Sequence, residues 1–150
     1  MVRFDPVEHQ SDYDDLMYLM RKDSSSYMND TLNKIESSWE KLYAMVQSVG
    51  TVYRVIKDEQ ITGYLWIEER GRVVHIHGLV MKDAYKSKGI ATEALTCLEH
   101  TYRETKDALE LGVHESNIPA KSLYEKLGYE TVRRIDQIGF LIMQLNLTTA

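Results

Sequence analysis

Two histidines, His75 and His77, stand two residues apart in the run "VVHIHGLVM", which has the composition of a β-strand. Alternate residues of a strand project from the same face, so we expect the two imidazoles side by side. An imidazole has an ordinary pKa of about 6.5, which suits it to take up a proton at neutral pH. The pair therefore indicates general-base chemistry. Two other interpretations stay open: half-buried histidines bonded to their neighbours, or two ligands of a metal ion, although no third ligand accompanies them in the sequence.

A second candidate site lies in "AYKSKGIATEAL", residues 84–95, where a glycine and two lysines open a helical pattern. The first turn of a helix has unpaired N–H groups and a partial positive charge, which together attract phosphate. Gly89 allows close approach to the backbone, and Lys86 and Lys88 add positive charge. The glycine patterns of a Walker loop and of a dinucleotide fingerprint are both missing. The alternative is an ordinary helix with a basic first turn.

The elements that must position these residues follow from hydrophobic periodicity. Apolar residues at helical spacing predict helices over residues 13–20, 35–46, 90–102 and 117–128. Ser11 or Asp12 can cap the first helix, and Asn117 can cap the last, where Pro119 occupies the first turn. A polar patch over residues 23–30 joins the first two helices. Seven strands are expected within residues 1–10 and over 51–56, 61–67, 73–81, 108–113, 129–135 and 139–147.

The resulting order, β-α-α-β-β-β-α-β-α-β-β, predicts an α/β fold. Residues 1–150 are expected to form a single domain, since this length suits one. Short polar connections in the middle of the chain favour antiparallel hairpins, and the strand–helix–strand units of the second half favour some parallel pairing. We therefore expect a mixed, mostly antiparallel sheet of six to seven strands with helices on both faces.

Composition narrows the range of functions. A net charge of −5 argues against binding to nucleic acid or to an anionic membrane, which needs a basic surface. The single cysteine, Cys97, excludes an intrachain disulfide and fits a reducing compartment, which predicts a cytoplasmic location. We also expect no membrane span and no signal peptide, because no apolar run is long enough and charges are scattered through the first ten residues.

The glycine segment resembles the pyrophosphate-binding motif of the GNAT N-acetyltransferase superfamily. That motif consists of Gln or Arg, two variable residues, Gly, one variable residue, and then Gly or Ala. Gly89 and Ala91 fit, whereas Lys86 stands where the family has Gln or Arg. The later block "ALELGVHESNIPAKSLYEKLGYE" is similar to a second motif of the same family. The two blocks have the expected order and spacing over roughly residues 73–130, and the predicted element order agrees with the family fold.

The resemblance implies acetyl-CoA as co-substrate and no metal. The pyrophosphate would lie on the amides of residues 87–92, and the pantetheine arm would pair like an extra strand with the backbone of residues 79–81. The cofactor-binding residues implied in this way are Leu79, Val80, Met81, Lys86, Ser87, Lys88, Gly89, Ile90, Ala91, Thr92, Asn117, Ala120 and Tyr124.

Acetyl transfer to an amine has three chemical demands: a proton must leave the ammonium, the oxyanion must be stabilised, and the departing thiolate benefits from a proton. In the "LYEKLG" block Tyr124 is expected beside the sulfur as general acid, the alternative being a core aromatic. The His-x-His pattern resembles that of the arylalkylamine N-acetyltransferases, so His75 and His77 are expected to relay protons from the amine.

Three residues near the first helices, where this family usually builds its acceptor site, are candidates for binding the amine: Asp23, Tyr27 and Asp30. Carboxylates there can hold an ammonium, and an aromatic ring can add cation–π attraction. The alternative is a solvated loop with core tyrosines.

The sequence thus predicts an acyl-CoA N-acyltransferase that moves an acetyl group to a primary amine of a small molecule. Two alternatives remain: a protein Nα- or lysine acetyltransferase, and a GNAT-fold module that binds acyl-CoA without turnover. The expected partners are a small-molecule or peptide amine, with no nucleic acid and no membrane. A homodimer is compatible with the resemblance.

Overall fold

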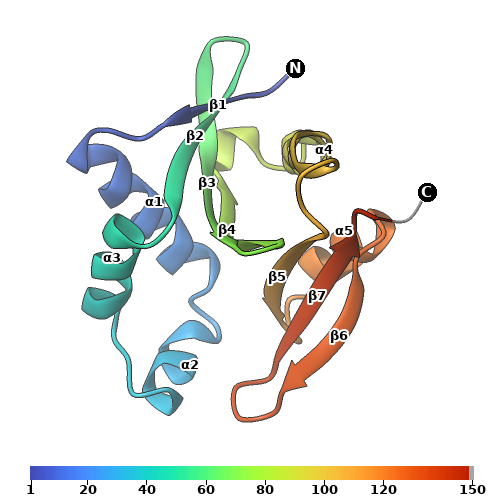
Figure 1. Cartoon of the computed structure of the whole chain (residues 1–150). Coiled ribbons are helices and arrows are strands. Elements are labelled where there is room, and N and C mark those ends of the chain that lie inside the picture. Colours follow the sequence, from blue (N-terminus) through green and yellow to red (C-terminus); the bar gives the residue numbers. More distant parts are fainter. Residues whose placement is uncertain (149–150) are drawn as a thin grey trace.

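In the computed structural model, which describes residues 1–148, seven strands form one sheet in the order β1-β2-β3-β4-β5-β7-β6 (Figure 1). The strands are β1 (Arg3–Pro6), β2 (Thr51–Lys57), β3 (Gln60–Arg70), β4 (Val73–Met81), β5 (Ala108–His114), β6 (Glu130–Ile135) and β7 (Phe140–Asn146). The helices are α1 (Gln10–Asp23), α2 (Met28–Lys34), α3 (Trp39–Ser48), the short 3-10 helix η1 (Asp83–Tyr85), α4 (Ile90–Tyr102) and α5 (Ile118–Lys126).

The expected mixed and mostly antiparallel α/β sheet is confirmed. Among the described strands, only β4 and β5 pair in parallel, and α4 is the crossover between them. The second strand–helix–strand unit, β5-α5-β6, produces no second parallel pair because β7 lies between β5 and β6 and is antiparallel to both.

The N-terminal helices differ from the prediction at three points. Helix α2 occupies part of the segment expected to be a polar loop, and the helix expected from Ile35 begins at Trp39. Ser38 caps that helix by accepting a hydrogen bond from the backbone N–H of Lys41 at 3.1 Å. Neither Ser11 nor Asp12 caps α1, which begins at Gln10 with His9 as its N-cap. The Asp12 carboxylate is turned inward instead.

Two hydrophobic clusters fix the helices to opposite faces of the sheet. On one face, α4 packs on strands from both halves of the sheet, through residues that include Leu65, Val74, Leu95, Leu109 and Met143, each at most 2% exposed. On the other face, α1 and α3 pack on β2–β4 through residues that include Leu16, Val46, Tyr64 and Trp66, also at most 2% exposed. Each fully buried large apolar side chain stabilises the fold by about 1.5–3 kcal/mol.

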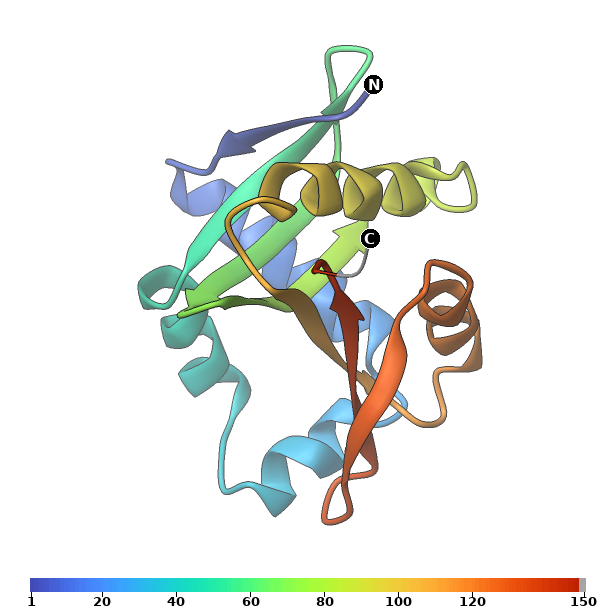
Figure 2. The ribbon, with the colours of Figure 1, turned by 45° about the vertical axis from the view of Figure 1, so that its right-hand side comes forward.

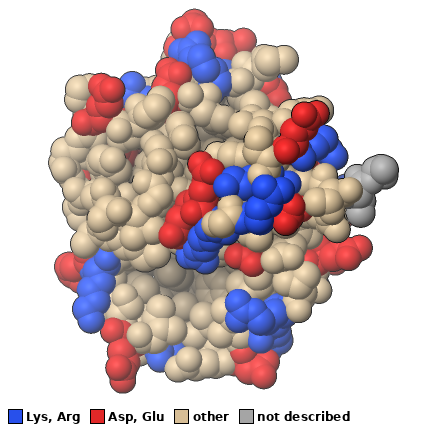
Figure 3. Space-filling view, viewed as in Figure 1, with Lys and Arg blue, Asp and Glu red and all other residues tan. Residues whose placement is uncertain are grey.

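A gap opens in the sheet between β4 and β5. Their pairing covers only Val73–Ile76 with Ala108–Leu111, after which the two strands diverge (Figure 2). Residues 78–81 of β4 remain paired with β3, but in the described part of the chain no strand lies on their other side. Viewed from the side of Figure 1, the surface is hollowed below a central band of charged residues (Figure 3). Backbone N–H and C=O groups along the free side of β4 therefore need other partners.

A β-bulge lies at the point where the strands separate. Gly78 pairs with Trp66 and Ile76 pairs with Ile67, so His77 is an extra residue on β4. The bulge shifts the alternation of side chains: Ile76 packs on the α4 side, whereas Val80 packs on the α1 and α3 side. Bulges commonly re-aim side chains next to functional sites.

Candidate active site

The two imidazoles lie side by side, as their spacing predicts. The ring centroids of His75 and His77 are 4.6 Å apart, with the planes at 69°. The His77 ring also stacks on Trp66 at 4.3 Å, and Trp66 belongs to the cluster beneath α1 and α3. The histidines therefore project from β4 on that face of the sheet.

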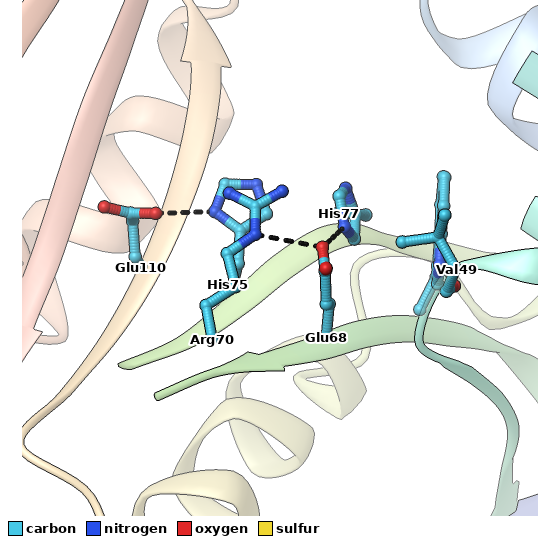
Figure 4. A network of polar contacts seen from close by, with 7 residues as sticks. Val49, Glu68, Arg70, His75, His77 and Glu110 are labelled. Carbon is cyan, nitrogen blue, oxygen red and sulfur yellow. Dashed lines mark hydrogen bonds and ion pairs between the residues drawn. The ribbon is translucent and has the colours of Figure 1, made fainter. Parts of the chain in front are cut away.

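Each imidazole is held by its own carboxylate (Figure 4). His75 Nδ1 is 2.7 Å from Glu110 Oε2, and His77 Nε2 is 2.8 Å from Glu68 Oε1. Burial opposes ionisation of Glu110, but hydrogen bonds from Gln144 and His75 outweigh it and lower the pKa of Glu110. An ionised carboxylate only accepts hydrogen bonds, so each ring donates the N–H at that position. This leaves His75 Nε2 and His77 Nδ1 as the acceptor atoms of the neutral rings.

The electrostatic surroundings keep His77 neutral. Burial lowers its pKa, and the nearby charges of His75 and Arg70 lower it further, against the raising effect of its hydrogen bond to Glu68. The same hydrogen bond from His77, together with that from Arg70 at 2.9 Å, lowers the pKa of Glu68. A neutral imidazole beside an ionised carboxylate can accept a proton at neutral pH.

A cleft of about 240 Å³ lies between the open side of β4, the first helices and α5. It brings His77 together with several residues expected to contact the cofactor, namely Leu79, Val80, Asn117, Ala120 and Tyr124. A second cavity of about 330 Å³ lies toward β6 and β7 and includes His75 and Glu110. His77 lines both cavities, so the histidine pair stands at their boundary.

Tyr124 enters the cleft from α5. Asn117 caps this helix, as predicted, by accepting a hydrogen bond from the backbone N–H of Ala120 at 3.3 Å. The Tyr124 ring packs against Tyr129 with centroids 5.9 Å apart. Burial raises the pKa of Tyr124 to about 12. The phenol therefore keeps its proton at neutral pH, which a general acid requires.

The glycine turn has the backbone shape needed to present amides to an anion. Gly89 is the N-cap of α4 with φ +77°, and no side chain caps the helix there. Ser87 also has a positive φ, +59°. A Cβ built at Gly89 would meet nothing within 4 Å, so the turn faces open space. The first-turn amides of α4 lack intrahelical acceptors and are available to a ligand. Lys86, by contrast, points toward α1, with its Nζ 2.7 Å from Asp23 Oδ1.

The three acceptor candidates are not brought to one place. Tyr27 and Asp23 line the cleft, whereas the Asp30 side chain is 72% exposed, pairs with Lys34 and is not among the lining residues. The Tyr27 ring stacks on the His114 ring, with centroids 4.4 Å apart. Burial raises the pKa of the Tyr27 phenol. Tyr27 and Asp23 therefore remain as candidates for binding the acceptor amine.

Sequence reasoning missed the carboxylates Glu68 and Glu110. Glu110 carried a signal, because it is a lone charge inside the apolar strand "ALELGV". Glu68 carried none, since it opens the polar run "EERGR" and resembles any solvated hairpin residue. Within residues 1–148, no group of three or more His, Cys, Asp or Glu side chains is placed to hold a metal ion, and no helix is long and apolar enough to cross a membrane.

Comparison with known proteins bears on this arrangement. The model of the acetyltransferase (GNAT) family matches residues 13–129, most of the chain. The chain belongs to the GNAT acetyltransferase family. A curated relative, the uncharacterized N-acetyltransferase YvbK of Bacillus subtilis (strain 168), is 28% identical over 94 residues, which are 61% of this GNAT chain. The match spans 60% of the length of that relative.

Solved structures share the GNAT fold. The ribosomal-protein-S18-alanine N-acetyltransferase of Escherichia coli superposes with a TM-score of 0.69 at 16% identity, covering 100% of this chain and 96% of that one. PaiA N-acetyltransferase of Thermoplasma acidophilum, in complex with coenzyme A, gives 0.70 at 17% identity, covering 97% and 99%. A GNAT family acetyltransferase of Elizabethkingia anophelis with acetyl-CoA bound gives 0.72 at 13% identity, covering 97% of each chain. At these identities the likeness concerns the fold.

Proposed function

We propose that this GNAT chain transfers an acetyl group from acetyl-CoA to the primary amine of a small molecule by direct attack. The observation that carries the proposal is the cleft at the open side of β4, where His77 and Tyr124 approach from different elements. A base and an acid on two sides of one cleft match the two proton transfers of amide formation.

The chain's residues fit coenzyme A at two places. The amides of residues 87–92 and the open space at Gly89 suit a diphosphate. The free side of β4, around Leu79 and Met81, offers backbone hydrogen bonds to an extended amide-containing arm. Asn117 and Ala120 would flank the arm from α5. When bound, acetyl-CoA supplies an acyl group activated as a thioester.

The histidine pair and Tyr124 would divide the proton transfers. The Nδ1 atom of His77 takes a proton from the acceptor ammonium, while Glu68 stabilises the imidazolium that forms. His75, whose ring contacts His77 and is held by Glu110, takes this proton from His77 and releases it toward the second cavity. Tyr124 gives its proton to the departing sulfur. A neutral amine is required for attack because an alkylammonium, with a pKa of about 10.4, has no lone pair.

The acceptor side of the cleft favours a small molecule over a protein. It is lined by side chains that include Met20 of α1, Tyr27 at the N-cap of α2, Trp39 of α3 and Phe140 of β7. The whole cleft measures about 240 Å³, which is below the usual range of about 300–1,000 Å³ for small-ligand pockets. We also propose that residues 1–150 act as one domain.

Calorimetric titration with acetyl-CoA, followed by thiol release across a panel of amines, tests this function. The panel contains small primary amines and peptides with a free N-terminus or lysine. Uptake with turnover of small amines is expected. Peptide turnover alone would indicate a protein acetyltransferase, and uptake without turnover a binding module.

The proton relay has a separate test. In the double variant His75→Gln/His77→Gln the rate should fall most at neutral pH, while His100→Gln, on the exposed side of α4, should behave as the wild type. An unchanged pH–rate profile in the double variant would exclude the relay.

A further inference from the structure

A chain of ion pairs connects the glycine turn to the acceptor side of the cleft. Lys86 Nζ lies 2.7 Å from Asp23 Oδ1 and 3.1 Å from Asp83 Oδ1, and Lys22 pairs with Asp83. Asp23 is the last residue of α1, and Lys86 directly follows η1. Lys86 therefore bridges two elements that would contact different substrates.

Asp23 has a second environment besides Lys86. It is the one acidic side chain among the described residues that line the cleft. Its neighbours there are mainly apolar or aromatic, among them Met20, Tyr27 and Trp39. An ammonium that enters this cleft needs a counter-charge, because an unpaired charge is costly to desolvate. Asp23 is the carboxylate placed to provide it, but in the free protein its charge is already matched by Lys86.

Lys86 likewise has a second role open to it. It stands three residues before Gly89, at the start of the turn that the proposed function assigns to the diphosphate. Its side chain is 39% exposed, so it can change rotamer without unpacking the core. A diphosphate carries more negative charge than the Asp23 carboxylate and would compete for the same ammonium.

We propose that Asp23 binds the acceptor ammonium and that Lys86 masks Asp23 until coenzyme A binds. This inference rests on the proposed function, because it takes the diphosphate to lie on the glycine turn. Binding of coenzyme A draws Lys86 toward the phosphates and releases the carboxylate into the cleft. The acceptor site is thereby completed by the first substrate. Because such coupling is reciprocal, a bound amine strengthens binding of coenzyme A by the same factor.

The first test is calorimetric titration of coenzyme A into four proteins. Asp23→Asn removes the nearer of the two carboxylates that hold Lys86, so coenzyme A should bind about two- to fivefold more tightly, the range expected for an exposed ion pair. Lys86→Met should weaken binding. Asp30→Asn, which removes an acid paired elsewhere, should match the wild type. Unchanged or weaker binding in Asp23→Asn would overturn the mask, whereas absence of binding in the wild type would overturn the proposed function itself.

The second test measures the coupling with benzylamine as probe, by NMR titration with and without saturating coenzyme A, which carries no acetyl group. In the wild type coenzyme A should tighten benzylamine binding about two- to fivefold, because the same Lys86–Asp23 ion pair limits both effects. In Lys86→Met the affinity should be the same in both conditions, and in Asp23→Asn it should be weak in both. Coupling in Lys86→Met equal to that of the wild type, or no benzylamine binding with coenzyme A present, would refute the inference. Thermal unfolding of each variant checks that the fold is retained.

Discussion

Replacing Glu68 with Gln should shift the pH at which the enzyme becomes active. The Glu68 carboxylate is 2.8 Å from His77 Nε2 and raises the pKa of that imidazole against the lowering effects of burial, His75 and Arg70. Its removal leaves the lowering effects unopposed. His77 must be neutral to accept a proton, so activity rises as the pH increases through its pKa. The acidic limb of the kcat/KM profile should therefore move to lower pH.

The size of the shift follows from the contact. Hydrogen bonds to charged groups contribute about 1.5–3 kcal/mol. Arg70 shares the same carboxylate oxygen at 2.9 Å and reduces its net effect, so the lower end of that range applies. Since one pKa unit corresponds to about 1.4 kcal/mol, a shift of about one pH unit is expected. The amide oxygen of Gln can still accept a hydrogen bond from the ring but stabilises the imidazolium less than a carboxylate does, so the maximal rate should also fall.

The assay is thiol release from acetyl-CoA between pH 5 and 9, with the acceptor found in the amine panel. Glu69→Gln is the matched control, because Glu69 is the next residue along β3 and pairs with Lys106, not with a histidine. An acidic limb that stays in place in Glu68→Gln, or that moves equally in Glu69→Gln, would show that this carboxylate does not control the base.

Two further substitutions test other parts of the structure. Tyr124→Phe removes the proposed acid and should lower kcat about 100-fold while calorimetry shows unchanged coenzyme A affinity; a kcat near that of the wild type would leave the phenol as a packing residue. Asp12→Ala breaks a pair with Arg54 in which Asp12 is 6% exposed and also accepts a hydrogen bond from Tyr64, and should lower the free energy of unfolding in urea by about 3 kcal/mol. The exposed Asp14→Ala serves as its control, and equal losses in both would argue against a special role for the buried pair.

The strands could be predicted from their composition and from the turn residues that end them, even where the strand is exposed, as β6 is. Runs such as "TVYRVI" and "ITGYLWI" are rich in β-branched and aromatic residues and end at turn residues. Helix α2 was missed because "MNDTLNK" is mostly polar and buries only Thr31 and Leu32. Tertiary contacts at those two positions, not a periodic apolar face, specify that helix.

The partners of the site residues could not be predicted in the same way. His75 contacts Glu110 across 35 positions of sequence, and Lys86 contacts Asp23 across 63. Such pairs depend on the strand order and on where α1 ends, and the residues near each site do not indicate either. The bulge at His77 did leave a local signal that the prediction did not use, because Gly78 follows it inside the strand pattern. Residue types thus indicated the chemistry, while topology determined which side chains serve it.

The short pairing between β4 and β5 has a mechanical consequence. In the described part of the chain, only four residue pairs connect the backbones of these two strands. The hydrophobic cluster under α4 contacts the strands on both sides of this junction. The relative orientation of the two halves of the sheet thus depends largely on the packing of Leu95 and Leu98 of α4 against both halves. Shortening Leu95 or Leu98 would therefore change the width of the opening between β4 and β5. The buried side of α4 thus controls the geometry of the cleft from the opposite face of the sheet.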